Sequence, residues 1–201
     1  MKDYIIKEEQ LDNDTVIQVY YDEHPYDPIE TLDIFEIINF HDRYKLGTIN
    51  TTKDKFNDEI TRMKNWEDEN WYAATWADVQ QALGEHYDAI HIRPLMLHDH
   101  SGISIYIGTS GDRWDSSRIG YIYTTKNKVA EFGLDSELID EQIDRFIKEY
   151  DQYLRGEVYA YNVVKYTTCN LGERHTEVLE SCSGFLSTDE AIEHAKEAIT
   201  V

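Results

Sequence analysis

The stretch DSELIDEQIDRFIKEYDQYLR (residues 135–155) has the clearest period in the sequence. Its apolar residues recur at spacings of four, three, one, three and four, and they are Ile139, Ile143, Phe146, Ile147, Tyr150 and Leu154. This spacing places them in one stripe along an α-helix. Asp135 or Ser136 can cap the first turn, and Gly156 follows where a left-handed residue ends a helix. The pattern predicts a long helix over 135–155 with one apolar face.

Segments rich in β-branched and aromatic residues lie on both sides of this helix and are typical of strands. They cover residues 15–21, 34–40, 89–97, 103–107, 119–124, 158–167 and 177–185. Shorter helical patterns cover 52–64, 78–87 and 189–199, the last with Ala191, Ile192, Ala195 and Ile199 facing inward. Turn-like connections favour antiparallel pairing. We therefore predict an α+β fold in which a mainly antiparallel sheet packs against helix 135–155 and the C-terminal helix.

The length of 201 residues suits a single α+β domain over 1–201. A division into an N-terminal subdomain 1–88 and a C-terminal subdomain 89–201 is the alternative. No run of about 18 apolar residues exists, so no membrane association is expected. The N-terminal segment lacks the apolar core and small-residue cleavage site of a signal peptide, which favours a cytoplasmic location in the host cell. In that reducing compartment Cys169 and Cys182 are expected to be free thiols, with a disulfide across a hairpin as the alternative.

Charge is the outstanding compositional feature, because 40 acidic residues against 19 basic ones give a net charge of −21. Residues 1–33 carry net −8, residues 135–155 net −4 and residues 156–201 net −5. This sign repels nucleic-acid phosphates and attracts basic protein surfaces, so we expect a protein partner and no direct nucleic-acid binding. The candidate partner-binding acids are Asp22, Glu23, Asp27, Glu30, Asp33, Asp140, Glu141, Asp144, Glu190, Glu193 and Glu197. The alternative is an acidic surface that only keeps the protein soluble.

Few residues carry a recognisable chemical motif. His91, His98 and His100 with Asp99 suggest a metal site, but a turn at residues 98–102 explains the same residue types through backbone preferences. Cys169, His175 and Cys182 have no recognised zinc spacing. We therefore expect no metal, no cofactor and no identifiable catalytic residue.

The tryptophans Trp66, Trp71 and Trp76 recur every five residues, a period that fits neither a helical face nor a strand. Their acidic setting makes them candidate interface aromatics, and a place in the core is the alternative. Trp114 and Asp115 precede a strand, where a structural turn is favoured over a pocket wall.

Several motifs together resemble a known group of proteins. They are Asp99-His-Ser-Gly-Ile103, Trp114-Asp-Ser116, Ile119-Gly-Tyr-Ile-Tyr123, Glu149-Tyr-Asp-Gln-Tyr-Leu-Arg-Gly-Glu-Val-Tyr159, Tyr21-Asp-Glu-His-Pro25 and His41-Asp-Arg-Tyr-Lys-Leu-Gly47. This set resembles an uncharacterised family of acidic proteins encoded by phages and conjugative elements of Gram-positive bacteria. The chain departs from that family at Ser183, where a tryptophan is expected. The resemblance implies a mobile-element origin and no particular chemistry.

Charge and resemblance together favour a counter-defence protein of a phage or mobile element, analogous in function to antirestriction and anti-CRISPR proteins. It would bind and inhibit a host DNA-binding protein, a restriction or CRISPR nuclease with a basic groove, by acidic mimicry of DNA. Two alternatives stay open at this point. One is an accessory binding module of the mobile element. The other is an enzyme of unknown type with the His98-Asp99-His100 and Trp114-Asp115 turns at its site.

Overall fold

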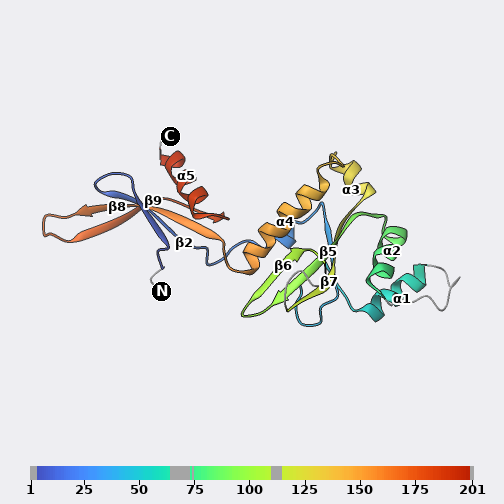
Figure 1. Ribbon diagram of the computed structural model, residues 1–201. Coiled ribbons are helices and arrows are strands. Elements are labelled where there is room, and N and C mark those ends of the chain that lie inside the picture. Colours follow the sequence, from blue (N-terminus) through green and yellow to red (C-terminus); the bar gives the residue numbers. More distant parts are fainter. Residues whose placement is uncertain (1–3, 64–72, 74, 110–114, 200–201) are drawn as a thin grey trace. The chain divides into compact units, whose positions relative to one another are not determined.

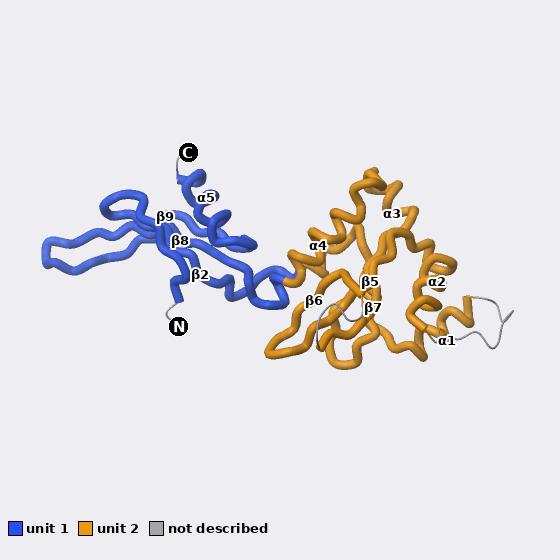
Figure 2. The backbone as a smooth tube through the Cα atoms, viewed as in Figure 1, with its two compact units in different colours: residues 1–27, 152–201 blue, residues 28–151 orange. Residues whose placement is uncertain are grey.

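The chain forms two compact units in the computed structural model, which describes residues 4–63, 73, 75–109 and 115–199. Unit 1 combines the two chain ends, Met1–Asp27 and Gln152–Val201, and unit 2 is the continuous segment Pro28–Asp151 (Figure 2). Helices and strands occur in both, so the α+β fold class is confirmed. The boundary considered between residues 88 and 89 lies inside unit 2.

Unit 1 is an antiparallel four-stranded sheet with the order β1-β2-β8-β9, accompanied by helix α5. Its elements are β1 (Lys7–Gln10), β2 (Thr15–Tyr21), β8 (Tyr159–Thr168), β9 (Arg174–Phe185) and α5 (Thr188–Ile199). Ile17 pairs with Val163 and Val19 with Tyr161, so alternate residues of β2 and β8 present one apolar face. Ala191, Ile192 and Ala195 of α5 are buried against this face.

The predicted inward position of Ile199 is wrong, because this side chain at the last residue of α5 is 40% exposed. Strand β1 was not predicted, since its sequence KEEQ contains no apolar residue. It forms because it adds to β2 at the edge of the sheet, where polar side chains are tolerated.

Unit 2 is built on a five-stranded sheet with the order β4-β3-β7-β5-β6, in which only the β3–β4 pair is parallel. The strands are β3 (Glu36–Asn39), β4 (Ile49–Asn50), β5 (Ala89–Asp99), β6 (Ile103–Ile107) and β7 (Ser116–Thr125). The other elements are η1 (Pro28–Thr31), α1 (Lys53–Met63), α2 (Trp76–His86), α3 (Lys126–Glu131) and α4 (Ile139–Leu154). Ile38, Tyr121 and Tyr123 form a core with α1 and α2 on one side of the sheet (Figure 1).

Helix α4 lies on the other side of this sheet (Figure 1). It buries Ile139, Ile143, Ile147 and Tyr150, as the predicted stripe requires. It begins at Ile139 rather than at Asp135, because Asp135 closes a separate turn through the backbone N–H of Glu137 and Leu138. The single expected sheet is in fact two sheets, and the C-terminal helix α5 packs against the four-stranded sheet of unit 1.

Strands β3 and β7 approach each other closely at Gly120, which pairs with Asn39. A Cβ atom on Gly120 would lie 1.8 Å from the carbonyl oxygen of Ile38, so only glycine fits. Just beyond this crossing, Phe40 donates its backbone N–H to Ile119 over 2.7 Å. Among the described residues, no helix is both long and apolar enough to cross a membrane.

Candidate functional site

Helix α5 presents a row of carboxylates on its outer face. Glu190, Glu193 and Glu197 follow one another at spacings of three and four residues, which places them on one side of the helix, and all three are exposed. The opposite side is buried in the sheet of unit 1. Within the described part of the chain, none of the three has an ion-pair partner. We call Glu190, Glu193 and Glu197 the α5 stripe.

Neighbouring acids of unit 1 have a structural role instead. Asp189 forms an ion pair with Lys7, and Glu9 forms one with Lys196, so both pairs join α5 to strand β1. The hydrogen bond and charge of Lys7 hold the pKa of Asp189 below its ordinary value. These contacts help to hold α5 against the sheet, so the α5 stripe lies on a helix that is attached to β1.

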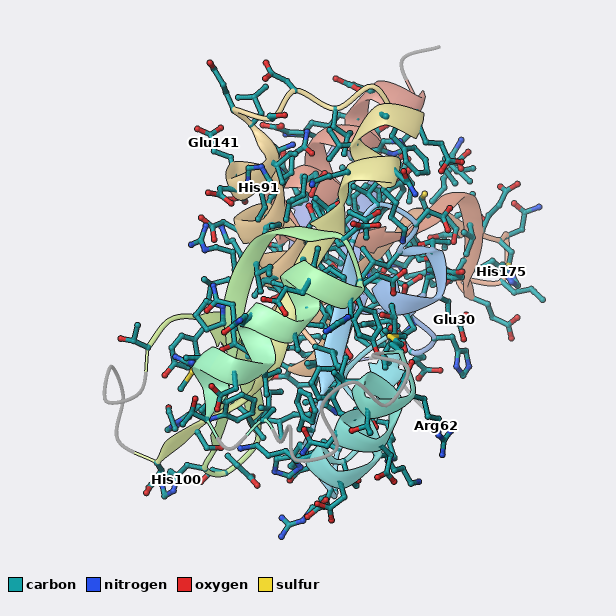
Figure 3. The ribbon with its side chains drawn as sticks, turned by 90° about the vertical axis from the view of Figure 1, so that its right-hand side faces the viewer. Glu30, Arg62, His91, His100, Glu141 and His175 are labelled. Atoms are coloured by element: carbon teal, nitrogen blue, oxygen red, sulfur yellow. The ribbon has the colours of Figure 1, made fainter. Side chains whose placement is uncertain are left out.

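The predicted acids of α4 are largely engaged within the protein. Asp140 lies 3.2 Å from His91 and 3.6 Å from Arg93, and Asp144 lies 3.4 Å from Arg93. Glu141 is exposed and points away from the ribbon near His91 (Figure 3). Asp140 and Asp144 thus have partners on β5 that no helical pattern reveals, and their role in partner binding stays a prediction.

The remaining predicted acids are divided between the units. Asp22, Glu23 and Asp27 belong to unit 1, whereas Glu30 and Asp33 belong to unit 2. Asp22 accepts the backbone N–H of His24 over 3.0 Å and so shapes the turn that follows β2. The α5 stripe therefore differs from the other predicted acids. Among the described residues, it is the only group of three of the eleven acids that lies on one face of one element and has no ion-pair partner within the protein.

An exposed strand lies beside α5 in the same unit. Strand β9 is an outer strand of its sheet, and its residues from Arg174 to Ser181 are exposed. Val178 and Leu179 are 54% and 43% exposed, so two adjacent apolar side chains of this strand face solvent. Outer strands offer backbone groups for pairing with another chain. Sequence reasoning missed this surface, because the apolar residues of β9 predict a strand but not its place at the edge.

The candidate metal ligands His91, His98, His100 and Asp99 do not gather. Strand β5 continues to Asp99, so His98 lies in the strand, 3.4 Å from the hydroxyl of Ser116, and not in a turn as predicted. Asp99 instead accepts the hydroxyl of Tyr44 over 3.1 Å. These residues are thus used in side-chain contacts of the sheet.

One group of three metal-ligating side chains does come together within the described residues, at the hairpin between β8 and β9. Ligand atoms of Cys169, Glu173 and His175 lie within 4.8 Å of one another. Glu173 and His175 are exposed and Cys169 is half-buried. Three ligands are fewer than the four of a closed zinc site, so the cluster does not by itself make a structural metal centre.

Both cysteines, Cys169 and Cys182, are free, as predicted. Of the three candidate interface tryptophans, Trp66 and Trp71 lie outside the described residues. Trp76 packs edge-on against Phe40 and Tyr121, with ring centroids 5.7 and 6.0 Å away, and is half-buried. It is therefore part of the edge of the unit 2 core. Comparison with models of protein families, with curated proteins and with solved structures gives no match.

Proposed function

We propose that the protein is a counter-defence factor of a phage or mobile element that binds a basic groove of a host nuclease and competes there with DNA. The α5 stripe carries this proposal, because it sets three exposed carboxylates in a row on a supported helix. The proposed location is the cytoplasm of the host cell, where such a nuclease works.

The spacing of the α5 stripe can be compared with that of DNA. From Glu190 to Glu197 the helix rises about 10 Å, which gives roughly one charge per 5 Å. One DNA strand carries a charge about every 3.4 Å along the axis. The stripe is therefore less dense than DNA, and further acids of the same unit add to its field. Unit 1 has 16 acidic against 6 basic residues, a net charge of −10 in 77 residues.

A strongly negative unit attracts a basic partner over a distance set by salt. The screening length is about 10 Å at 0.1 M ionic strength and about 3 Å at 1 M. Binding through the α5 stripe should therefore be fast at low salt and weaken as salt is added.

The experiment is a displacement assay with purified restriction and CRISPR nucleases of a Gram-positive host. Fluorescent target DNA is bound to each nuclease in 50 mM salt, and the protein is titrated in. We expect loss of the DNA-bound signal for at least one nuclease, and a weaker effect in 200 mM salt. If the protein binds one or more of these nucleases but displaces DNA from none of them, competition with DNA is ruled out.

A second candidate function rests on strand β9. Its exposed edge with Val178 and Leu179 suits an accessory module that takes up a strand of another protein of the same element. Co-purification from infected cells separates the two functions. The first predicts that a host nuclease is captured, and the second predicts an element-encoded protein whose binding is lost in the variant Val178→Lys.

A further inference from the structure

Unit 2 contains a pocket of about 550 Å³ that is lined by three basic side chains, Arg43, Lys53 and Arg118. Four separate segments form it. Phe40 and Arg43 follow β3, Arg118 lies on the neighbouring strand β7, and Lys53 and Trp76 are the first residues of α1 and α2. The hydrogen bond between Phe40 and Ile119 holds the two strand segments together.

The charge of this pocket is opposite to that of the protein. Its lining has three basic residues and one acidic residue, Asp42, whereas the whole chain has 19 basic and 40 acidic residues. Arg43 has Asp99 at 3.5 Å. Lys53 and Arg118 have no carboxylate at ion-pair distance within the described residues. Among the residues that the structure describes, these two cations are thus not paired with a carboxylate, although the chain has a large excess of carboxylates.

Trp76 holds these two cations in place. The Nζ of Lys53 lies 4.6 Å from the ring centroid, and the guanidinium carbon of Arg118 lies 5.8 Å from a centroid of the same side chain. A cation over an indole ring is attracted by the ring quadrupole, but its net charge is retained. The contacts of Trp76 with Phe40 and Tyr121 fix the ring in turn. The site is therefore preorganised and positively charged.

Arg118 also has an unused hydrogen-bond donor. Its Nη1 donates to the hydroxyl of Tyr121 over 3.3 Å, but its Nε is buried and has no hydrogen-bond partner among the described residues. A buried N–H group without a partner is unfavourable, so the described protein groups satisfy this guanidinium only in part. Burial raises the pKa of Tyr121, so this hydroxyl stays neutral and does not balance the guanidinium charge.

The beginnings of two helices add to the positive field. Helices α1 and α2 each have 11 residues, and their first residues line the pocket. The N-terminal end of a helix carries a partial positive charge that favours anions. In α2 the capping box of Thr75 and Asp78 occupies some of the free N–H groups, so the side chains of Arg118 and Lys53 supply the main donors.

We propose that this pocket binds a small phosphorylated ligand of nucleotide size. Arg118 and Lys53 would bind the phosphate oxygens, and Phe40 and Trp76 would contact the organic part. The volume lies in the range of about 300–1,000 Å³ that small-molecule sites occupy. The net charge of the protein does not prevent this binding, since charges more than about 8 Å away are largely screened at physiological ionic strength. The inference is independent of the α5 stripe in unit 1.

The test is calorimetric titration of the full-length protein with ADP, inorganic pyrophosphate and adenosine as probes, at the physiological ionic strength of about 0.15 M that screens the distant carboxylates. ADP should bind saturably, pyrophosphate more weakly, and adenosine at least ten-fold more weakly than ADP. Arg118→Gln and Lys53→Gln should each weaken ADP binding about ten-fold or more, because each removes a charge-assisted hydrogen bond. Thermal melts of the variants check that they are folded, and the second position keeps the test valid if one variant is not.

Lys55→Gln is the matched control, because Lys55 is exposed on the same helix two residues further along and does not line the pocket. It should leave ADP binding unchanged. An equal loss of ADP affinity in Lys55→Gln and Lys53→Gln would show that ADP is attracted only by the general positive charge of this surface. That result would overturn the proposed site. Adenosine binding as tightly as ADP, or no saturable binding of ADP and pyrophosphate, would overturn it as well.

Discussion

Gly120 offers a sharp test of the architecture of unit 2 and of the pocket that depends on it. In the variant Gly120→Ala the new Cβ would lie 1.8 Å from the carbonyl oxygen of Ile38 and 2.9 Å from its carbonyl carbon. Both atoms belong to the backbone of β3, so no side chain can move aside, and the two strands must separate. Overpacking typically costs about 1–3 kcal/mol, and a clash with backbone belongs at the upper end or above it.

We therefore expect Gly120→Ala to lower the free energy of unfolding by about 3 kcal/mol or more. For a unit of 124 residues, this corresponds to a drop in melting temperature of roughly 10 °C. Urea and thermal unfolding measure both quantities. The same separation would displace Phe40 from Ile119 and weaken ADP binding in the pocket.

The matched control is the same chemical change in the same unit, Gly84→Ala. Gly84 is exposed near the end of α2, and its new Cβ would meet only the carbonyl oxygen of Ala89 at 3.9 Å, an ordinary contact. Alanine is favoured over glycine in helices, so this variant should gain about 0.5–1 kcal/mol. A Gly120→Ala variant that unfolds at the same urea concentration as the wild type would refute the β3–β7 packing described above.

Three further predictions concern groups outside the pocket. The pKa of Asp12 is lowered mainly by the backbone N–H of Asp14, and that of Asp189 mainly by Lys7. A carboxyl group whose pKa is lowered by folding stabilises the folded state above its unfolded-state pKa. The urea midpoint of unit 1 should therefore fall as the pH drops below the ordinary value of 3.8. The midpoint should fall less steeply in the variants Asp12→Asn and Asp189→Asn, which lack one of these carboxyl groups. A thiol reagent should titrate two thiols per unfolded chain without reductant, whereas a disulfide would leave none. Arg93→Ala should cost only about 0.2–1 kcal/mol in urea unfolding, because its partners Asp140 and Asp144 are half-exposed; a loss above about 3 kcal/mol would indicate a buried ion pair.

Local pattern explains most of the elements that the sequence analysis predicted. Four of the six residues of the predicted apolar stripe are buried in α4, and β2 coincides with the predicted strand 15–21. Both follow from the sequence because the spacing of apolar residues shows which face of an element is buried. The pairing of β2 with β8 could not be predicted in this way. It joins segments more than 130 residues apart, and the local sequence of neither strand indicates which strand it pairs with. The division into two units follows from that pairing.

The candidate sites were predictable only where one element carries them. The α5 stripe follows from helical spacing alone, so the sequence analysis included all three of its residues. The partners of Asp140 and Asp144 lie on β5, and the pocket collects residues from four segments between Phe40 and Ile119. Such sites depend on tertiary structure, and their basic residues are inconspicuous in a sequence dominated by acids.

Inhibition of DNA cleavage by the host nuclease tests the central claim about the α5 stripe most directly. The measurement compares the wild type with the triple variant Glu190→Gln, Glu193→Gln, Glu197→Gln and with a control triple, Asp58→Asn, Glu131→Gln, Glu137→Gln. The control removes the same formal charge from exposed positions of unit 2. We predict that the α5 variant needs at least ten-fold more protein for half-inhibition at 50 mM salt, while the control stays within about two-fold of the wild type, since close charge pairs at interfaces contribute about 1.5 kcal/mol or more. Equal inhibition by the α5 variant and the wild type would contradict the claim.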